Sequence, residues 1–354
     1  MDIRENRHNY GIDLLRIAAM GMIVAHHFAL HSGISFDTGT GNDILMQIMA
    51  LGGKTGVNIF VLITGFYSTG RIRREKILGL IGSTTFYSIV LTLLAVVLGS
   101  AALSKKLLMK AVLPWLLGGN YWFIITYLEL YLLTPVLNKV AQALDTRSFE
   151  KYLGLFTLLL CIAPTVIGKF IEINDFGYNS LVWFVYLYFL GAYLSKQPRT
   201  GKTWQYLHAA LGLIVAQIAA CAAIQAGIAK GITELVLRCI SDYSANAIFP
   251  LAIAVAMLLG FQRMDISLGQ KTIQTIGSAT LGIYLFHDNI NFRSTLWHYV
   301  HQLVTGLGTI PFIIYAVISV CTVFVLGCMV ELLRDTATMY IRKLLIAPQK
   351  KQPR

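Results

Sequence analysis

The sequence has few charged residues, few cysteines and no long polar or low-complexity stretch, and each shortage excludes a class of protein. Charged residues make up 13% of the 354 residues, whereas an ordinary soluble domain carries about 25%. The five cysteines are odd in number and lack the C-x2-C spacing of a metal site, so we expect neither a disulfide framework nor a zinc site. Without polar linkers or repeats, the chain is expected to form one domain, residues 1–354.

Hydrophobic residues, by contrast, are abundant. They form 56% of the sequence, the mean hydropathy is +0.65, and many apolar runs reach the ~20 residues that a helix needs to cross a bilayer. The formal net charge of +12 does not indicate nucleic-acid binding, because the sequence has no soluble domain to present a basic face. The basic cytoplasmic loops of a membrane protein explain this charge more simply.

The apolar runs predict an all-α polytopic membrane protein with about ten transmembrane helices. The expected spans are approximately 10–31, 44–68, 77–100, 121–137, 153–169, 180–195, 205–228, 246–261, 273–290 and 307–332. Most Lys and Arg residues fall in alternate connecting segments, so the positive-inside rule predicts that both termini are cytoplasmic. Residues from about 333 to 354 then form a basic cytoplasmic tail. We expect a multi-pass protein of the cell membrane, which would be the cytoplasmic membrane in a bacterium.

Two segments fit this topology less simply. Ser104–Asn120 is basic although it falls on the outer side, and its pattern suits an amphipathic or re-entrant piece at the outer interface. If this segment spans the membrane instead, the C-terminus changes sides. The first span follows Arg4 and Arg7 as in a signal peptide, but it contains Arg16 and has no clear cleavage site, so we expect a retained first helix.

The first span, within Asn9–Gly33, carries ionisable residues where a bilayer disfavours them. A cation at the bilayer centre costs roughly 2.5–3.5 kcal/mol on insertion scales, so intramembrane ionisable residues are candidates for function. Arg16 and His27 are eleven positions apart, which returns a helix to within about 20° of the same face and separates them by about 16 Å along the axis. His26 lies about 80° away from this stripe. Asp13, three positions before Arg16, is close enough to form an ion pair with it.

Arg16, ten intervening residues and His27 resemble the R-x10-H signature in the first helix of the acyltransferase-3 family of membrane proteins. Three further segments resemble patterns of the same family. They contain Gly56, Phe60, Gly65 and Phe66 in the second span, Trp122, Glu129, Tyr131 and Pro135 in the fourth, and Tyr284, Leu285 and His287 in the ninth. The second span departs from the pattern, because Asn58 stands where an acid is usual and Thr64 where Ser is usual.

This resemblance implies an enzyme that uses cytosolic acyl-CoA, most simply acetyl-CoA, to acylate a hydroxyl of a cell-surface or lipid-linked glycan. It also implies ten membrane helices and a stand-alone member without the fused esterase-like domain of some relatives. No metal is expected, because a thioester donor needs only a positioned base. The expected partners are membrane lipid and the glycan acceptor, with no nucleic acid.

Roles for individual residues are assigned from the resemblance and from their positions. His27 is the expected base, and it either takes the hydroxyl proton directly or first accepts the acyl group as an acyl-imidazole. Glu129, expected to be a buried carboxylate, is the second catalytic candidate. Arginine forks bind phosphate, so the CoA phosphates are assigned to Arg16, Arg71, Arg73, Arg74 and Lys76. The acceptor is assigned to Trp122, His287, Asn291 and Arg293 at the outer mouth.

Simpler interpretations of these residues stay open. Arg16 can snorkel to the cytoplasmic interface, His27 can be a hydrogen-bonded packing residue, and the basic residues 71–76 can serve topology alone. Gly56 and Gly65 can serve close helix packing, and Tyr121 and Trp122 can be interfacial aromatics. The competing function is a polytopic transporter of a polysaccharide or lipid-linked sugar, although the internal repeat typical of transporters is not visible. A polyprenyl-dependent glycosyltransferase would usually show large acidic outer loops, which this sequence lacks.

Overall fold

The computed structural model describes residues 8–34, 41–117, 121–166, 180–198, 200–229, 247–302 and 307–346. Within these ranges the regular elements are helices and no strand occurs, which confirms the all-α prediction. The α-helices are α1 (Tyr10–His31), α2 (Gly41–Phe66), α3 (Arg74–Val97), α4 (Lys105–Val112), α5 (Pro114–Leu117), α6 (Trp122–Ala143), α7 (Thr146–Thr157), α8 (Ala163–Val166), α9 (Leu181–Lys196), α10 (Thr203–Ala229), α12 (Ile248–Phe261), α13 (Gln270–Ser278), α14 (Thr280–His287), α15 (Arg293–Gln302) and α16 (Thr309–Ile346).

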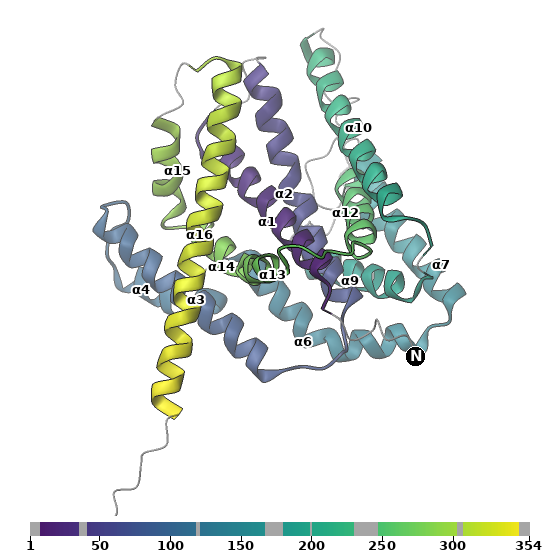
Figure 1. The fold of residues 1–354 in the computed structure, drawn as a ribbon, viewed down its shortest axis with the longest axis horizontal. Coiled ribbons are helices and arrows are strands. Elements are labelled where there is room, and N and C mark those ends of the chain that lie inside the picture. The colour runs from purple at the N-terminus through teal and green to yellow at the C-terminus, as the bar shows by residue number, and fades with distance from the viewer. Residues whose placement is uncertain are drawn as a thin grey trace, which may run out of the picture.

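Helix α1 lies at the centre of the bundle (Figure 1). It begins after Asn9, whose side chain caps the helix by accepting a hydrogen bond from the Ile12 amide. Around it pack α2 and α12, and also α13, α14 and α16 from the last third of the chain. Side chains on α1 are therefore placed beside residues that are far away in the sequence.

Five helices, α1, α2, α3, α6 and α16, are long and apolar enough to cross a membrane, and α9 and α12 are apolar but shorter. This supports a multi-pass membrane protein. Two of the predicted spans are not single α-helices. The span 153–169 contains a π-helical turn at Leu158–Ile162 between α7 and α8, and the span 273–290 is divided into α13 and α14.

Helix α2 approaches two neighbours closely because it presents glycines to them. A β-carbon at Gly56 would lie 2.7 Å from a backbone oxygen of α1, and one at Gly65 would collide with the backbone of Tyr188 on α9. The predicted packing role of both glycines is confirmed. On the same helix, the side-chain oxygen of Asn58 accepts a hydrogen bond from the indole of Trp183 at 3.0 Å, and both side chains are buried. The amide that replaces the family's usual acid therefore has a buried partner.

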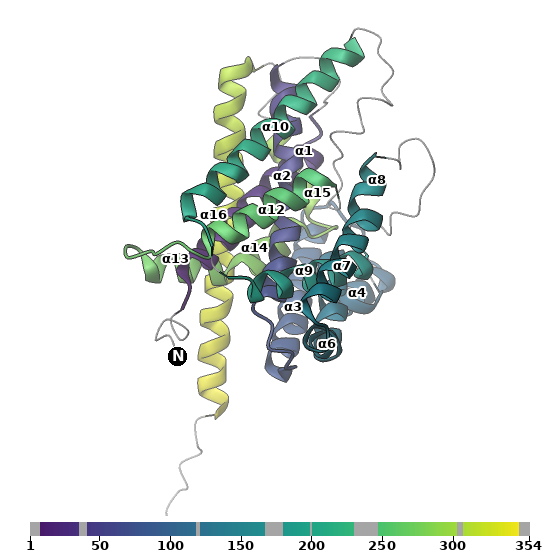
Figure 2. The same cartoon turned by 90° about the vertical axis from the view of Figure 1, so that its right-hand side faces the viewer.

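The basic segment Ser104–Asn120 and the C-terminal segment are helical in their described parts, whereas Arg4 and Arg7 before the first span lie outside the described residues. Helices α4 and α5 contain 8 and 4 residues and pack against α3, so in the described residues this segment is too short to cross a bilayer. Residues 118–120 lie outside the described part. Helix α16 continues without a break for 38 residues, so the last span and the start of the expected tail form one helix. Its final turns project beyond the other helices (Figures 1 and 2), and residues 347–354 lie outside the described part.

Candidate active site

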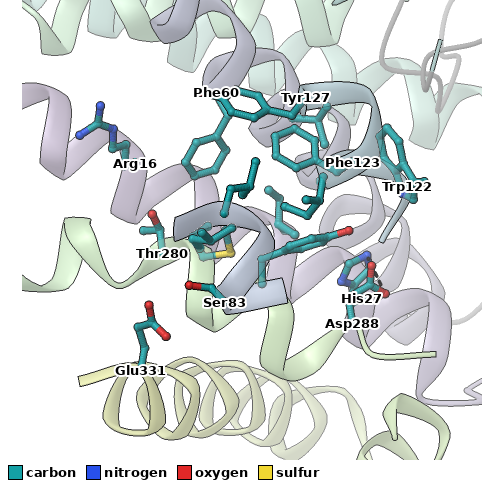
Figure 3. Close-up of a pocket in the computed structure, with 18 of the residues that line it drawn as sticks. Arg16, His27, Phe60, Ser83, Trp122, Phe123, Tyr127, Thr280, Asp288 and Glu331 are labelled. Atoms are coloured by element: carbon teal, nitrogen blue, oxygen red, sulfur yellow. Dashed lines mark ion pairs between the residues drawn. The ribbon is translucent and has the colours of Figure 1, made fainter. Parts of the chain in front are cut away.

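A cavity of about 780 Å³ lies beside α1, between α2, α3, α6, α14 and α16. Arg16 lies at one end, and His27 and Asp288 lie at the other (Figure 3). Between the two ends the walls are mostly apolar, with contributions from Met20, Ile23, Val57, Phe60, Leu80, Phe123 and Leu281. We call the two ends the Arg16 end and the His27 end.

The cavity lining includes His26 and Leu30 of α1 and, at the spacing of one helix face, Arg16, Met20, Ile23, His27 and His31. These positions recur every three or four residues, which is the spacing of one helix face. The prediction that Arg16 and His27 share a face is confirmed. Because the helix rise separates them by about 16 Å, a ligand that contacts both must be long and thin.

A chain of two hydrogen bonds fixes the tautomer of His27. Nδ1 of His27 lies 2.9 Å from Nε2 of His287, and Nδ1 of His287 lies 2.6 Å from the Ile283 carbonyl oxygen. A carbonyl only accepts, so His287 carries its proton on Nδ1, and in its neutral form its Nε2 is an acceptor. His27 must then donate from Nδ1. The lone pair of neutral His27 is therefore on Nε2, which is the form that a base requires.

The carboxylate of Asp288 lies next to that free nitrogen. Its Oδ1 is 3.9 Å from Nε2 of His27 and 3.1 Å from Nη1 of Arg293. The Asp288 side chain is only 4% exposed, and that of His27 is 12% exposed. An ionised Asp288 places a negative charge 3.9 Å from the nitrogen that would accept the proton. His27 can therefore act as a base whose conjugate acid has a nearby counter-charge.

The turn that follows α14 places Asp288 in the cavity wall. The hydroxyl of Tyr121 donates to the Leu285 carbonyl at 3.0 Å and accepts from the side-chain amide of Asn289 at 2.9 Å. Tyr121 and Asn289 are both fully buried. The interpretation of Tyr121 as an interfacial aromatic is therefore wrong, because this side chain holds the turn. Sequence analysis did not identify Asn289. A polar residue only two positions after the motif histidine His287 was nevertheless a signal that it belongs to the same site.

At the other end, Arg16 forms an ion pair with Asp13. Nη1 of Arg16 lies 3.0 Å from Oδ1 of Asp13, and Oδ2 of Asp13 lies 2.5 Å from Nε2 of His8. The predicted Asp13–Arg16 pair is confirmed. Lys76 also lines the cavity, and its ammonium group lies 3.0 Å from the hydroxyl of Tyr127.

Glu331 on α16 is a buried carboxylate that the sequence analysis missed. Its oxygens accept two hydrogen bonds from Arg334 at 2.8 Å and one from the hydroxyl of Tyr87 at 2.9 Å. Glu331 and Arg334 both line the cavity, and Glu331 lies on the Arg16 side in Figure 3. An acid at the end of an apolar run, followed three residues later by Arg, is a signal that would have found this pair.

The structure does not bring every predicted site residue to the cavity. Glu129 is exposed and does not line it, so the expectation of a buried carboxylate at this position is wrong. Arg71, Arg73 and Arg74 are also exposed and lie outside the lining. The lining does include Trp122 and Arg293.

Two residues assigned to the acceptor do not line the cavity. Asn291 donates from its side chain to Thr92 at 3.0 Å and is not part of the lining. His287 is fully buried behind His27, which makes it a positioning residue. His26 points toward α2, where its Nδ1 donates to the Ala50 carbonyl at 2.5 Å, in agreement with its predicted place off the Arg16 stripe.

The chain was compared with known proteins. A family model described as an acyltransferase domain, that of the acyltransferase-3 family, matches residues 9–330. No curated protein and no solved structure matches the chain. The matched range contains α1 and α14, which carry His27 and His287, and it ends one residue before Glu331.

Proposed function

The chain belongs to the acyltransferase-3 family of membrane acyltransferases, and from this premise we propose that it transfers an acyl group, acetyl in the simplest case, from acyl-CoA to a hydroxyl of a cell-surface or lipid-linked glycan. The observation that carries the proposal is the shape of the cavity. It has a base with a fixed tautomer at one end, Arg16 and the Glu331–Arg334 ion pair at the other, and an apolar passage between them. A long donor with a phosphorylated end and a reactive thioester end matches this arrangement.

The chemistry is assigned to His27. Its Nε2 takes the proton of the acceptor hydroxyl while the hydroxyl oxygen attacks the thioester carbonyl. The C–S bond then breaks, and the proton passes from His27 to the leaving thiolate, which gives the acyl ester and free CoA. An acyl-imidazole route gives the same products in two steps. That route would leave the acyl group on His27 when no acceptor is present, and mass spectrometry of the protein after reaction with donor alone distinguishes the two.

The donor's phosphates are assigned to the Arg16 end. Arg16 offers a planar guanidinium group and Lys76 offers a point charge, and both line the cavity. The guanidinium group of Arg334, which also lines it, is already bound to Glu331 and Asp335. The exposed Arg71, Arg73 and Arg74 follow α2 directly, and we assign them to phosphates that remain outside the cavity. The pantetheine arm passes between the apolar walls toward His27.

The acceptor is assigned to the His27 end. Trp122 offers an aromatic face and Arg293 offers hydrogen-bond donors, which suits a sugar ring carrying several hydroxyl groups. In the proposed topology the chain has ten spans, both termini are cytoplasmic, and the protein lies in a bacterial cytoplasmic membrane. The Arg16 end then faces the cytosol, where acyl-CoA is made, and the His27 end faces outward, where surface glycans mature.

The test is transfer from labelled acetyl-CoA by the protein purified in detergent. The wild-type protein is expected to release free CoA and to transfer the labelled acetyl group to a glycan acceptor. Without an acceptor it should transfer the group to water and release labelled acetate. His27→Ala is expected to abolish this activity, because a positioned base contributes about 10²- to 10⁴-fold. His26→Ala is the matched control and should lose much less, since its ring is held against α2. Full activity in His27→Ala, or an equal loss in both variants, would remove His27 from catalysis. A folded wild-type protein that neither binds nor consumes acetyl-CoA would favour a transporter.

A further inference from the structure

The His27 end of the cavity contains a cluster of potential metal ligands. His27 and His31 lie four residues apart on α1, and Asp288 reaches them from the end of α14. Each offers one ligand atom, and these atoms lie within 4.8 Å of one another. The two imidazole rings are 5.4 Å apart between centroids and inclined by 36°. Helix geometry holds them on one face, and the Asp288 carboxylate lies 3.9 Å from Nε2 of His27.

Two imidazoles and one carboxylate form a common ligand set for zinc in proteins. Zinc-bound nitrogen and oxygen atoms lie about 2.0–2.2 Å from the metal, so ligand atoms in a tetrahedral site are roughly 3.3–3.6 Å apart. The 3.9 Å between Nε2 of His27 and Oδ1 of Asp288 is slightly longer than this, and no two ligand atoms of the cluster are more than 4.8 Å apart. Binding of one ion would therefore draw the three side chains closer together.

A supporting residue already orients one of these ligands as metal sites require. A histidine ligand usually donates its second ring N–H to a fixed acceptor, which sets the tautomer. Nδ1 of His27 has such an acceptor in His287, so Nε2 presents its lone pair at the cavity. Asp288 lies beside it in the turn after α14, and its Oδ1 accepts a hydrogen bond from Arg293 at 3.1 Å. His27 therefore has the outer partner that a metal site uses.

We propose that His27, His31 and Asp288 bind a zinc ion, and that the bound ion inhibits acyl transfer. Zinc occupies the lone pair on Nε2 of His27, so that nitrogen no longer accepts the hydroxyl proton. The inhibitory part rests on the proposed function, whereas the binding part does not. The ion acts as an inhibitor in this proposal, and the transfer reaction itself requires no metal.

Arg293 limits how tightly zinc binds. Its guanidinium group lies against Oδ1 of Asp288, the same oxygen that faces His27. Zinc and Arg293 therefore compete for one carboxylate, and the positive charge of Arg293 opposes a second cation. Removal of this charge should strengthen zinc binding, whereas loss of a ligand should weaken it.

Zinc titration by calorimetry of the metal-free full-length protein in detergent tests the binding part. The wild-type protein should bind one zinc ion, and His31→Gln should bind more than about 100-fold more weakly, since loss of a mere supporting residue already costs 10- to 100-fold. Arg293→Gln should bind about 10-fold more tightly, the worth of one charged hydrogen bond. His208→Gln, which changes an exposed histidine on α10, is the matched control and should bind like the wild type. Equal zinc affinity in the wild type and in His31→Gln would overturn the site.

Acyl transfer with and without zinc tests the inhibitory part. Each variant's rate in zinc is compared with its own rate without zinc. The wild-type and His208→Gln proteins should be inhibited over the concentrations at which calorimetry shows binding, and His31→Gln should need more than about 100-fold more zinc. Binding at the site without inhibition would overturn this part. If the metal-free protein transfers no acyl group, the proposed function fails, and the titration still decides the zinc site.

Discussion

At the scale of single residues, the proposed role of His27 as a base depends on a neighbour that does not line the cavity. His287 accepts the Nδ1 proton of His27 and is itself held by the Ile283 carbonyl. If this chain is broken, His27 can carry its proton on either nitrogen and its ring can turn. Part of the catalytic effect of a positioned base is then lost, although the base is still present.

We therefore predict that His287→Ala lowers kcat by part of the about 10²- to 10⁴-fold that a positioned base contributes, with little change in the KM for acyl-CoA. His287→Gln should recover some of the loss, because its side-chain oxygen can accept the same proton. Steady-state kinetics of the two variants measures this. A rise in KM with an unchanged kcat would instead indicate that His287 contacts a substrate.

A second prediction concerns Arg16 and tests the donor site. Arg16→Lys keeps the charge but loses the guanidinium fork, so the affinity for acetyl-CoA should fall by roughly 5- to 150-fold, or ~1–3 kcal/mol. The matched control is Arg147→Lys, because Arg147 is exposed on α7, does not line the cavity and has no assigned part in donor binding. Calorimetric titration of acetyl-CoA into both folded variants gives the comparison. Equal affinity in Arg16→Lys and the wild type would remove Arg16 from the donor site.

The residues that sequence analysis placed correctly are those fixed by a single helix. Arg16, His27 and Asp13 lie on α1, and their relation follows from the helix repeat alone. Glu129 was placed wrongly because hydropathy gives the depth of a residue in a span but not the direction in which its side chain points. That direction depends on which helices pack nearby, and the same information was needed to find Glu331 on α16 and to place His287 behind His27.

At the scale of elements, each predicted span overlaps a helix, but α6 and α16 continue beyond the predicted ends at 137 and 332, and five of the described helices are long and apolar enough to cross a membrane. The span 273–290 is divided at Ala279, where Thr280 begins α14, and residues on both sides of the division line the cavity. Irregular backbone within a membrane protein is tolerated where it lines a cavity. The sequence contains no proline here, but Gly277 and Ser278 lie directly before the division, and Gly/Ser pairs are common sites of helix kinks.

The glycines of α2 give a prediction about helix packing. A β-carbon at Gly56 would press against the backbone of α1, whereas one at Gly82 on α3 would have no neighbour within 4 Å. Gly56→Ala should therefore destabilise the protein by about 1–3 kcal/mol, as overpacking does, while Gly82→Ala should be neutral or slightly stabilising because alanine favours a helix. Thermal unfolding in the same detergent compares the two. Equal melting temperatures would contradict the close α1–α2 contact.

At the scale of the whole molecule, α1 connects the two ends of the cavity and receives helices from both halves of the chain. The Arg16 end is built with α16, and the His27 end is built with the turn after α14. Neither end is complete without the last third of the sequence. This explains why the sequence indicated the first helix as the centre of the candidate site but supplied only part of the residues around it.

The last prediction concerns the orientation of the molecule in the membrane, and it depends on α4 and α5. These helices contain 8 and 4 residues, and a transmembrane helix needs about 20, so the chain should be on the same side of the membrane before α4 and after α5. Reporter proteins fused after Gly99 and after Leu117, both exposed positions, should therefore both report the outer side.

A fusion after Gly33 should also report the outer side, and fusions after Gly70 and after Arg354 should report the cytoplasm, because the basic residues from Arg71 onward follow the positive-inside rule. If the fusion after Leu117 reports the cytoplasm while that after Gly99 reports the outer side, the α4–α5 segment crosses the membrane, and every later segment changes sides. The His27 end would keep its outward position even then, because the side of α1 is set by the fusions at Gly33 and Gly70 alone.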